Sequence, residues 1–465
     1  MVNYHLVILT HGLWGKPAHM EYIESQINQH IHLKSPNEEV IVYKTGSHGG
    51  YLTYDGIDIN GKRISDEIIA QTELLSSNSI SDKVTKFSII GYSLGGLIAR
   101  YAIGVLYSKN YFENIEPINF ITFCSPHVGV LNPMNYTVAT NLFNRFVHHF
   151  LAHTGSQLFL KDKIEHRGKP LLAWMADPNS YFFISLKSFK YKSLYANIIH
   201  DRRTSWFTAG IQSLDPFNSM TNTSPLNITL GFVPKYETVV VDINQPIKYK
   251  EVKLISETST TIPKRFIRGL SWLRVLGTVI VYLPIWFIFF SVDSIFQRIK
   301  MNRRVKEFVR DTSNNLIYLY EMINDETLQV DESEEAENDD ESSYETNSEK
   351  ERDYLSDFEQ DFSNKVQDQQ DEFVETVYDV MNTNNMEAEK ELDVENYGNL
   401  IKLNFNSDQM FIINKLNSLG WKKYPVLIQN TKQTHAAAIY RFKDVNFDEG
   451  KVVIRHLIEE TFQVS

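Results

Sequence analysis

The chain has almost no cysteine: Cys124 is the single one among 465 residues. An internal disulfide framework is therefore excluded, and we expect the folded part to face a reducing compartment. Cys124 lies in an apolar run, which favours a buried structural thiol. The sequence also lacks the ligand spacing of a zinc site, a phosphate-binding P-loop and a basic helix with interleaved aromatic residues. We expect no metal, no cofactor and no nucleic-acid partner.

Positive charge is scarce in residues 325–395, which hold 27 Asp or Glu and four Lys or Arg. This stretch carries a formal charge of −23, so the rest of the chain carries +11 and would be attracted to an anionic membrane surface. The acidic stretch has too little apolar surface to offset the entropy lost on ordering, so residues 325–397 are predicted to be a disordered insertion. A solvated spacer is favoured over a phosphorylated segment that binds a protein, and no particular partner is indicated.

Strand-like runs alternate with helical stretches in the first half of the chain. The first run has no basic flank or cleavage site of a signal peptide, so it is predicted to be a strand and secretion is not expected. Residues 64–75 repeat apolar residues at helical spacing, as a crossover between parallel strands requires. This order predicts an α/β fold with a mostly parallel sheet. The predicted strands are residues 4–10, 39–43, 86–90, 119–124 and 193–199.

Residues 130–186 interrupt this alternation with aromatic and amphipathic stretches. We expect a cap inserted into the fold there. For residues 142–151 within it, an ordinary buried helix is an equal alternative, because a helix with one apolar stripe usually packs on a core.

Residues 275–292 carry no charge and are long enough to cross, or nearly cross, the hydrocarbon core of a membrane. Basic residues flank both ends, so the positive-inside rule places both ends on the cytosolic side and disfavours a single crossing. Pro284 would kink a helix at the middle of the run. We therefore expect a re-entrant hairpin or a wedge in one leaflet, which a lipid-droplet monolayer also accepts. A buried core helix is the alternative.

The sequence Gly91-Tyr92-Ser93-Leu94-Gly95 follows a short apolar run and precedes apolar residues at helical spacing. This is the pattern of a nucleophile elbow, in which a strand turns sharply into a helix and exposes the serine hydroxyl. Glycine on both sides of Ser93 allows the close packing that such a turn needs. A glycine-rich turn without catalytic function is the alternative.

An activated serine needs a base and a carboxylate that orients this base, and elbow enzymes order them as serine, acid, histidine. Asp201 follows a late predicted strand, so it would lie at the same sheet edge as Ser93. A turn aspartate that pairs with Arg202 or Arg203 is the alternative for this residue. Asp242, after another apolar run, is the second candidate for the acid.

Two histidines lie well beyond the candidate acid, His435 and His456. His435 occurs in a polar loop that turns into small residues, which leaves the imidazole room to reach the sheet edge. His456 lies in the alternating run 451–458, which is typical of a surface or partly buried strand residue. The sequence therefore favours His435 as the base.

The oxyanion donors are expected at two backbone positions. The first is the N–H of Leu94, directly after the nucleophile. The second is the N–H of Leu13 in the loop 10–15, where Gly12 and Gly15 allow a tight approach of the backbone. His11 in this loop is predicted to shape the loop by hydrogen bonding rather than to act as a second base.

These motifs together resemble the putative-serine-esterase lipase family of α/β-hydrolases, and within it the fungal lipid-droplet phospholipase B branch. The resemblance implies an α/β-hydrolase fold, a catalytic triad of Ser93, Asp201 and His435, a structural role for His127, and acyl esters of glycerophospholipids as substrates. Residues 203–206 depart from the valine-proline pair that is common after the acid in relatives. The motifs that carry the resemblance are residues 11–15, 91–101, 125–129, 196–202 and 434–437.

The predicted protein is a serine hydrolase at a lipid-droplet surface or an endoplasmic reticulum membrane, with its catalytic part facing the cytosol. The alternatives are a neutral-lipid lipase, a protein deacylase and, from another class, a catalytically inactive membrane-anchored scaffold. Four parts are expected along the chain. They are a hydrolase core at 1–262 with a cap near 130–186, a membrane-associating segment at 263–310, the acidic insertion at 325–397, and the rest of the core, with the catalytic histidine, at 398–465.

Overall fold

The structure is a computed structural model, and three sequence-based predictions lie outside the residues that it describes. These are the helix at 142–151, apart from residue 151, the hydrophobic segment 275–292 and the acidic insertion 325–397. In the described part of the chain, none of the helices has the length and apolar character needed to span a membrane. The described residues are 3–34, 39–77, 83–133, 151–162, 168–201, 203–217, 220, 226–251, 299–306 and 401–465.

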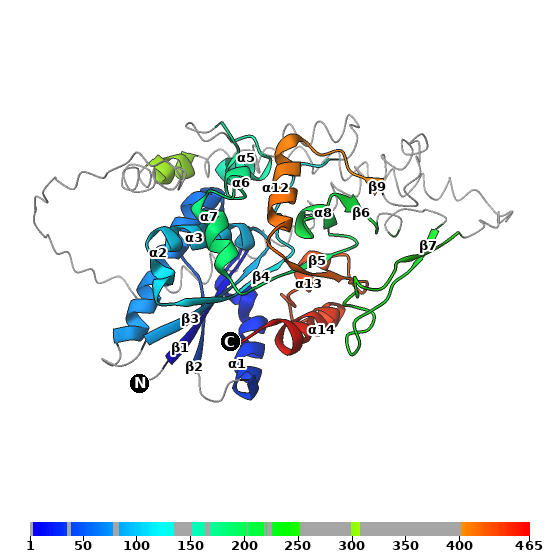
Figure 1. Cartoon of the computed structure of the whole chain (residues 1–465), viewed down its shortest axis with the longest axis horizontal. Helices are drawn as coiled ribbons and strands as arrows, with labels where there is room; N and C mark the ends of the chain where they lie inside the picture. The colour runs from blue at the N-terminus through cyan, green and yellow to red at the C-terminus, as the bar shows by residue number, and fades with distance from the viewer. Residues whose placement is uncertain are drawn as a thin grey trace, which may run out of the picture. The chain divides into compact units, whose positions relative to one another are not determined.

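A six-stranded sheet forms the centre of the fold, with the strand order β10-β5-β4-β3-β1-β2 (Figure 1). All neighbouring strands are parallel. The five strands predicted from the sequence are confirmed, and β10 is a sixth that the sequence analysis did not find. The strands are β1 (Asn3–Thr10), β2 (Glu39–Lys44), β3 (Lys83–Tyr92), β4 (Glu116–Phe123), β5 (Tyr191–Asn197) and β10 (Lys422–Val426).

Helices cover both faces of this sheet, as expected for parallel strands joined by crossovers. In Figure 1, α2 (Ile57–Ser77), α3 (Leu94–Ser108) and α7 (Tyr181–Ser188) lie on one face. The other face carries α1 (Glu21–Lys34) and α14 (Asp448–His456), whose apolar residues pack with those of the strands in one buried cluster. The predicted crossover helix at 64–75 is part of α2.

One secondary-structure prediction is wrong: His456 lies in a helix, not in a strand. Helix α14 has Asp448 and Glu449 in its first turn and Arg455 in its last, which suits the helix dipole. Its buried residues Gly450, Val453, Ile454 and His456 are spaced by three or four, so one face packs on the core. The β-branched run in the middle of this segment suggested a strand, but tertiary packing decides.

Shorter elements complete the described part of the chain. Three of them, α5, α6 and α7, lie between β4 and β5, where the cap is predicted. Two small antiparallel sheets, β6 with β9 and β7 with β8, accompany the central sheet. The remaining bounds are η1 (Pro17–Met20), η2 (Gly50–Tyr54), η3 (Tyr111–Glu113), α5 (Ala152–Leu158), α6 (Leu171–Trp174), α8 (Trp206–Ala209), β6 (Leu214–Asp215), β7 (Leu226–Thr229), β8 (Lys248–Glu251), β9 (Ile401–Lys402), α12 (Ser407–Asn417), α13 (Thr434–Ala437), η6 (Val445–Phe447) and η7 (Leu457–Thr461).

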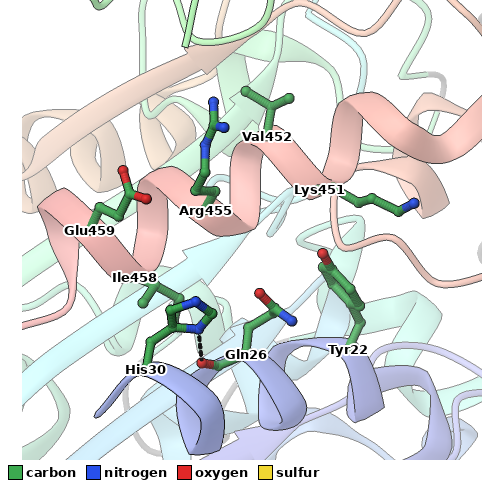
Figure 2. Close-up of a pocket in the computed structure, with 8 residues that line it drawn as sticks. All are labelled: Tyr22, Gln26, His30, Lys451, Val452, Arg455, Ile458 and Glu459. Carbon is green, nitrogen blue, oxygen red and sulfur yellow. Dashed lines mark hydrogen bonds between the residues drawn. The ribbon is translucent and has the colours of Figure 1, made fainter. Parts of the chain in front are cut away.

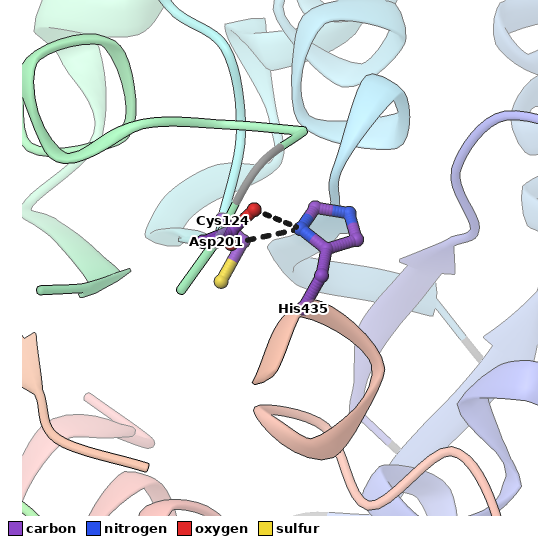
Figure 3. Close-up of side chains that lie close together, drawn as sticks. All are labelled: Cys124, Asp201 and His435. Atoms are coloured by element: carbon purple, nitrogen blue, oxygen red, sulfur yellow. Dashed lines mark hydrogen bonds and ion pairs between the residues drawn. The ribbon is translucent and has the colours of Figure 1, made fainter. Parts of the chain in front are cut away.

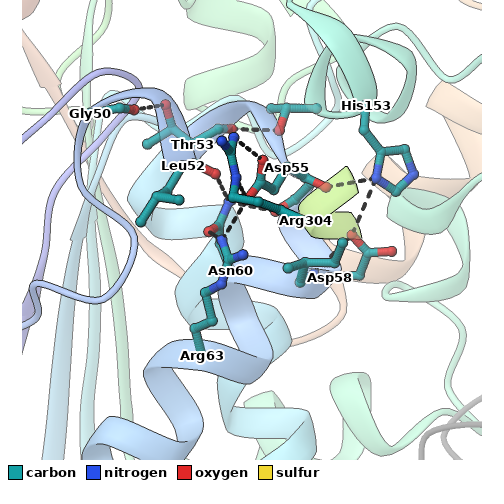
Figure 4. Close-up of polar contacts among 12 residues, drawn as sticks. Gly50, Leu52, Thr53, Asp55, Asp58, Asn60, Arg63, His153 and Arg304 are labelled. Carbon is teal, nitrogen blue, oxygen red and sulfur yellow. Dashed lines mark hydrogen bonds and ion pairs between the residues drawn. The ribbon is translucent and has the colours of Figure 1, made fainter. Parts of the chain in front are cut away.

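A buried carboxylate joins the described helical segment 299–306 to the core (Figure 4). Asp55, just after η2, is fully buried and forms ion pairs with Arg63 of α2 and Arg304. Arg304 donates to both carboxylate oxygens, over 2.7 and 3.2 Å. The backbone carbonyl of Asp55 accepts a hydrogen bond from Nδ1 of His153 in α5. The segment after the hydrophobic run is therefore held beside η2 and α5.

A groove between α1 and α14 lies on the other face of the sheet from α2 and α3 (Figure 2). Its lining contains two cations that already have partners. Lys451 pairs with Asp448, and Arg455 donates to the carbonyl of Lys235. None of the predicted catalytic residues lines this groove. The lining residues are Tyr22, Gln26, His30, Lys451, Val452, Arg455, Ile458 and Glu459.

Candidate active site

Ser93 lies at the turn between β3 and α3, at the carboxyl edge of the central sheet. Its backbone is strained, with φ 55° and ψ −128°, and it is the residue that precedes the first turn of α3. The N–H of Ser93 donates to the carbonyl of Phe123 at the end of β4, over 2.8 Å. The side chain is partly exposed, whereas its neighbours are buried. This is the geometry of the nucleophile elbow that the sequence predicts.

The glycines around Ser93 are required by close packing. A Cβ on Gly91 would lie 2.5 Å from the Cα of Gly96, and a Cβ on Gly95 would lie 2.3 Å from the carbonyl oxygen of Thr10. Both contacts involve backbone atoms, which cannot move aside like a flexible side chain. The strand, the helix and the loop after β1 therefore meet here in a way that only glycine permits.

The three predicted triad residues are brought together in one hydrogen-bonded line. Nε2 of His435 lies 2.9 Å from Oγ of Ser93. Nδ1 of His435 lies 2.9 and 3.1 Å from the two carboxylate oxygens of Asp201 (Figure 3). Both the imidazole and the carboxylate are buried. With its proton on Nδ1, His435 has Nε2 free to accept the proton of the serine.

The carboxylate of Asp201 is held in its ionised form. Burial alone would raise the pKa of Asp201, but the charge of His435 and hydrogen bonds from His435, Thr204 and Asn197 outweigh burial, so the pKa is lowered. The N–H of Thr204 donates to Oδ1 over 2.9 Å. The N–H of Arg203 also donates to Oδ1, over 3.2 Å. Asp201 can therefore orient the imidazole and stabilise its charged form.

The second candidates for acid and base lie elsewhere. Asp242 accepts hydrogen bonds from Asn244 and Gln245 in its own turn. Nδ1 of His456 lies 2.8 Å from the hydroxyl of Tyr195, in the core beneath the sheet. Neither residue is bonded to Ser93 or His435 among the described residues, so the geometry selects Asp201 and His435.

Cys124 is buried, as predicted, and adjoins the triad (Figure 3). Its sulfur, a carboxylate oxygen of Asp201 and a ring nitrogen of His435 lie within 4.8 Å of one another, a spacing that a metal ion could use. Burial, followed by the charge of Asp201, raises the pKa of the Cys124 thiol. The thiol therefore stays protonated, and metal ligation requires the thiolate. The hydrogen bond between Asp201 and His435 gives these groups a role without a metal.

The loop after β1 lies directly against the nucleophile. A Cβ on Gly12 would lie 2.7 Å from Cβ and 3.2 Å from Oγ of Ser93. Leu13 follows in this loop, and Leu94 opens α3, where backbone N–H groups have no partner within the helix. The two residues predicted to supply oxyanion donors thus flank Ser93 from two different elements.

Residues 2–213 match the family described as Putative serine esterase (DUF676). This match covers slightly less than half of the chain. The putative lipase ROG1 of Saccharomyces cerevisiae is 32% identical over 217 residues, which are 45% of this chain and 29% of the relative. The putative lipase C4A8.10 of Schizosaccharomyces pombe is 30% identical over 218 residues, 45% of this chain and 26% of the relative. The chain thus spans less than a third of either relative.

A solved structure, the phospholipase PlaB from Legionella pneumophila, is similar with a TM-score of 0.25 and 14% identity, over 54% of this chain and 50% of that chain. At this TM-score the similarity carries no argument about the fold or the activity. The family match ends at residue 213, so it includes Ser93 and Asp201 but not His435. The histidine of the candidate triad comes from the part of the chain that the family match does not cover.

Several supporting residues were not found from the sequence. The hydroxyl of Thr204 donates to Oδ2 of Asp201 over 3.1 Å, and the amide of Asn197 donates to the same oxygen over 3.1 Å. The hydroxyl of Tyr92 donates to the carbonyl of His435 over 3.2 Å. Tyr92 stands within the elbow motif, but its side chain gives no sequence signal for this contact. His127, expected to be structural, is fully buried, and its Nε2 is bonded to the hydroxyl of Thr122.

Proposed function

We propose that this chain is a serine hydrolase that cleaves acyl ester bonds of glycerophospholipids through an acyl-enzyme intermediate. The observation that carries the proposal is the 2.9 Å contact between Oγ of Ser93 and Nε2 of His435, with Asp201 on the other ring nitrogen. The match of residues 2–213 to a serine esterase family supports the same reaction class.

The first half of the reaction forms the acyl-enzyme. Oγ of Ser93 attacks the ester carbonyl carbon while Nε2 of His435 takes the hydroxyl proton. Asp201 stabilises the imidazolium, and the N–H groups of Leu94 and Leu13 hold the oxyanion of the tetrahedral intermediate. The intermediate collapses, the bond to the leaving alkoxide breaks, and His435 gives its proton to that oxygen.

The second half frees the fatty acid. Water replaces the leaving alcohol, and His435 removes a proton from this water as it attacks the acyl carbon. The second tetrahedral intermediate collapses to the fatty acid, and Ser93 recovers its proton from His435. The same three residues and the same donors thus serve both steps.

We also propose a lipid surface as the place of reaction, at a lipid droplet or the endoplasmic reticulum membrane and facing the cytosol. The support is the uncharged run 275–292 together with the ion pair of Arg304 and Asp55. Arg304 belongs to the described segment 299–306, which follows this run in the sequence and lies beside η2 and α5. Thr53 of η2 accepts a hydrogen bond from the N–H of Trp14, in the loop beside Ser93. The described segment 299–306 thus lies beside η2, which contacts the loop next to Ser93.

The test is fatty-acid release from phospholipid vesicles by the full chain and by Ser93→Ala. We expect the variant to lose activity by at least about 10⁴-fold, because it lacks the nucleophile. Ser108→Ala, at the far end of the same helix, is the control and should hydrolyse normally. Release by Ser93→Ala at the rate of the full chain would contradict the mechanism, and failure of the full chain to react with a fluorophosphonate would favour the inactive scaffold.

Two further arms of this assay test the substrate and the surface. Triacylglycerol and thioester substrates, offered beside phospholipid, separate the proposed phospholipase from a neutral-lipid lipase and a protein deacylase. A variant without residues 270–292 should retain hydrolysis of a short soluble ester and lose most hydrolysis of vesicles. Loss of the soluble-ester activity as well would place this segment in the folded core instead.

A further inference from the structure

Two stacked histidines hold the backbone of the loop beside Ser93. His48 follows β2, and its ring lies 3.9 Å from the ring of His11, centroid to centroid, at an interplanar angle of 11°. Both side chains are fully buried. The sequence assigned no role to His48, and it forms no hydrogen bond with the three triad residues in the described part of the chain.

Each of the two rings binds one carbonyl of the loop. Nε2 of His48 donates to the carbonyl of His11 over 3.2 Å, and Nδ1 of His11 donates to the carbonyl of Gly12 over 3.1 Å. The N–H of Gly15 donates to the same Gly12 oxygen over 3.0 Å. Two successive peptide groups, between His11 and Gly12 and between Gly12 and Leu13, are therefore fixed by their oxygens.

Fixing these oxygens also fixes the direction of the N–H groups. A peptide group is planar and trans, so its N–H points away from its carbonyl. The bonds to Gly12 oxygen thereby orient the N–H of Leu13, the expected oxyanion donor. The carbonyl of His11 is set against α3, because a Cβ on Gly95 would lie 2.4 Å from it. His48 thus anchors the loop at the point where it touches the elbow helix.

Both rings are held neutral, as this arrangement requires. Burial is the main cause that lowers the pKa of His48, to about 4, and it also lowers the pKa of His11 well below its usual value. A neutral imidazole has one N–H, and in each ring this N–H binds a loop carbonyl. The other nitrogens, Nδ1 of His48 and Nε2 of His11, have no hydrogen-bond partner among the residues that the structure describes.

We propose that His48 is a positioning residue for the oxyanion hole: its hydrogen bond to the His11 carbonyl and its stacking on the His11 ring align the Leu13 N–H with the carbonyl that Ser93 attacks. The proposal rests on the proposed hydrolase function. His48 lies between β2 and η2, outside the triad and outside the loop after β1 that donates a hydrogen bond to the oxyanion.

The experiment compares two variants with a short soluble ester and its thiono analogue, in which sulfur replaces the carbonyl oxygen. His48→Phe keeps a flat ring for the stack and removes the donor, whereas His48→Gln places an amide N–H near the position of Nε2. We expect His48→Phe to lower kcat for the ester by about tenfold or more at nearly unchanged KM, since misplaced oxyanion donors act on the transition state. His48→Gln should recover most of this loss.

The thiono ester distinguishes positioning from general disruption. Sulfur accepts hydrogen bonds weakly, so hydrolysis of the thiono ester should fall less than that of the ester in His48→Phe. The matched control is His5→Phe, which removes another fully buried histidine whose Nε2 is bonded to Ser88 at 2.7 Å, in the first half of β1. It should lower stability and leave the ratio of the two rates unchanged.

Three results would overturn the proposal while the full chain is active: an equal loss for both esters, a change in KM alone, or no rescue by His48→Gln. If His48→Phe does not fold, His48→Asn takes its place, because its shorter amide reaches only the position of Nδ1. An inactive full chain that a fluorophosphonate does not label would instead refute the hydrolase function itself. The two failures are therefore separate.

Discussion

The N-terminal part of the chain, residues 3–215, and the C-terminal part, residues 401–465, supply different pieces of the candidate site. The first contains Ser93 after β3, Asp201 after β5 and the loop after β1, and β4 lies between β3 and β5 in the sheet. The second contains His435, on the short helix α13 that follows β10. The region that matches the serine esterase family, residues 2–213, covers nearly all of the first part and none of the second.

This difference shows that the site depends on docking across a large gap in sequence. Strand β10 pairs in parallel with β5, the strand that leads to Asp201, and this pairing brings His435 to the same sheet edge. The hydroxyl of Tyr92 then holds the backbone of His435 next to the elbow. The N-terminal part positions nucleophile, acid and oxyanion donors, and the C-terminal part must be in place to supply the base.

The largest effect is expected from His435→Ala. Because it removes the base that activates Ser93, kcat should fall by about 10⁴-fold or more while the protein stays folded. The measurement is hydrolysis of a soluble ester, with circular dichroism to verify folding. An unchanged kcat in His435→Ala would contradict this prediction, because the C-terminal part would then contribute nothing to the chemistry.

The control for this variant comes from the same part of the chain. His456→Phe changes the other buried histidine of residues 401–465, which is bonded to Tyr195 rather than to Ser93. Stability should fall and kcat should stay within about twofold of the full chain. A loss of kcat as large as that of His435→Ala would show that general disruption of the C-terminal part, not removal of the base, stops the reaction.

The fold was predictable where local patterns and packing agree. The five strands of the N-terminal part are rich in β-branched and aromatic residues, which the sequence marks clearly; β1, β3, β4 and β5 are largely buried, and β2 is a partly exposed edge strand. Strand β10, with the sequence Lys-Lys-Tyr-Pro-Val, is an edge strand, and lysine and proline are typical of edges but weak as strand signals. The helix α14 was mistaken for a strand because Val452, Val453 and Ile454 are consecutive β-branched residues.

The site was predictable where chemistry restricts the residue type. Ser93 has its motif, and Asp201 and His435 follow from chain order and from the resemblance. The residues that hold these three side chains in place are not restricted to one residue type by the chemistry. Thr204 and Asn197 bind Asp201, and His48 binds the His11 carbonyl, through contacts that only the folded backbone creates. Many residue types can donate one hydrogen bond, so no local pattern marks these positions.

A smaller effect, on stability alone, is expected from Tyr195→Phe. The buried hydroxyl of Tyr195 in β5 lies 2.8 Å from Nδ1 of His456 and 2.7 Å from Oγ1 of Thr461, so it joins the two parts of the chain. Its removal should lower the free energy of unfolding by about 1–3 kcal/mol, because buried partners lose their hydrogen bonds. Urea unfolding measures this change, and kcat below the transition should stay unchanged.

The neighbouring Tyr424 of β10 provides the matched control. Its ring lies 5.0 Å from the ring of Tyr195, and its hydroxyl makes no hydrogen bond within the described residues. Tyr424→Phe should therefore change the free energy of unfolding by less than about 0.5 kcal/mol. Equal effects of the two variants would mean that the Tyr195 hydroxyl does not hold the C-terminal part in place.

The smallest expected effect is the pH dependence of the free energy of unfolding, to which one buried histidine in each part of the chain contributes. Burial, and for His5 also the charge of Lys86, lowers the pKa of His5 to about 3; burial lowers the pKa of His456 to about 4, against the opposing charges of Glu460 and Glu459. Between these values and about 6.5 the unfolded chain binds more protons than the folded chain. Their stabilising contribution is complete above pH 6.5 and is lost as the pH falls towards 4.

Each of the two histidines should therefore remove about 1–2 kcal/mol of stability between pH 7 and pH 5. Urea unfolding of the full chain, His5→Phe and His456→Phe at both pH values measures these contributions, and each variant should be less sensitive to pH than the full chain. If both parts unfold together, the two contributions appear in one transition. A separate first transition whose pH dependence disappears in His456→Phe would instead show that the C-terminal part detaches first, and activity should then be lost at that transition, because His435 leaves with it.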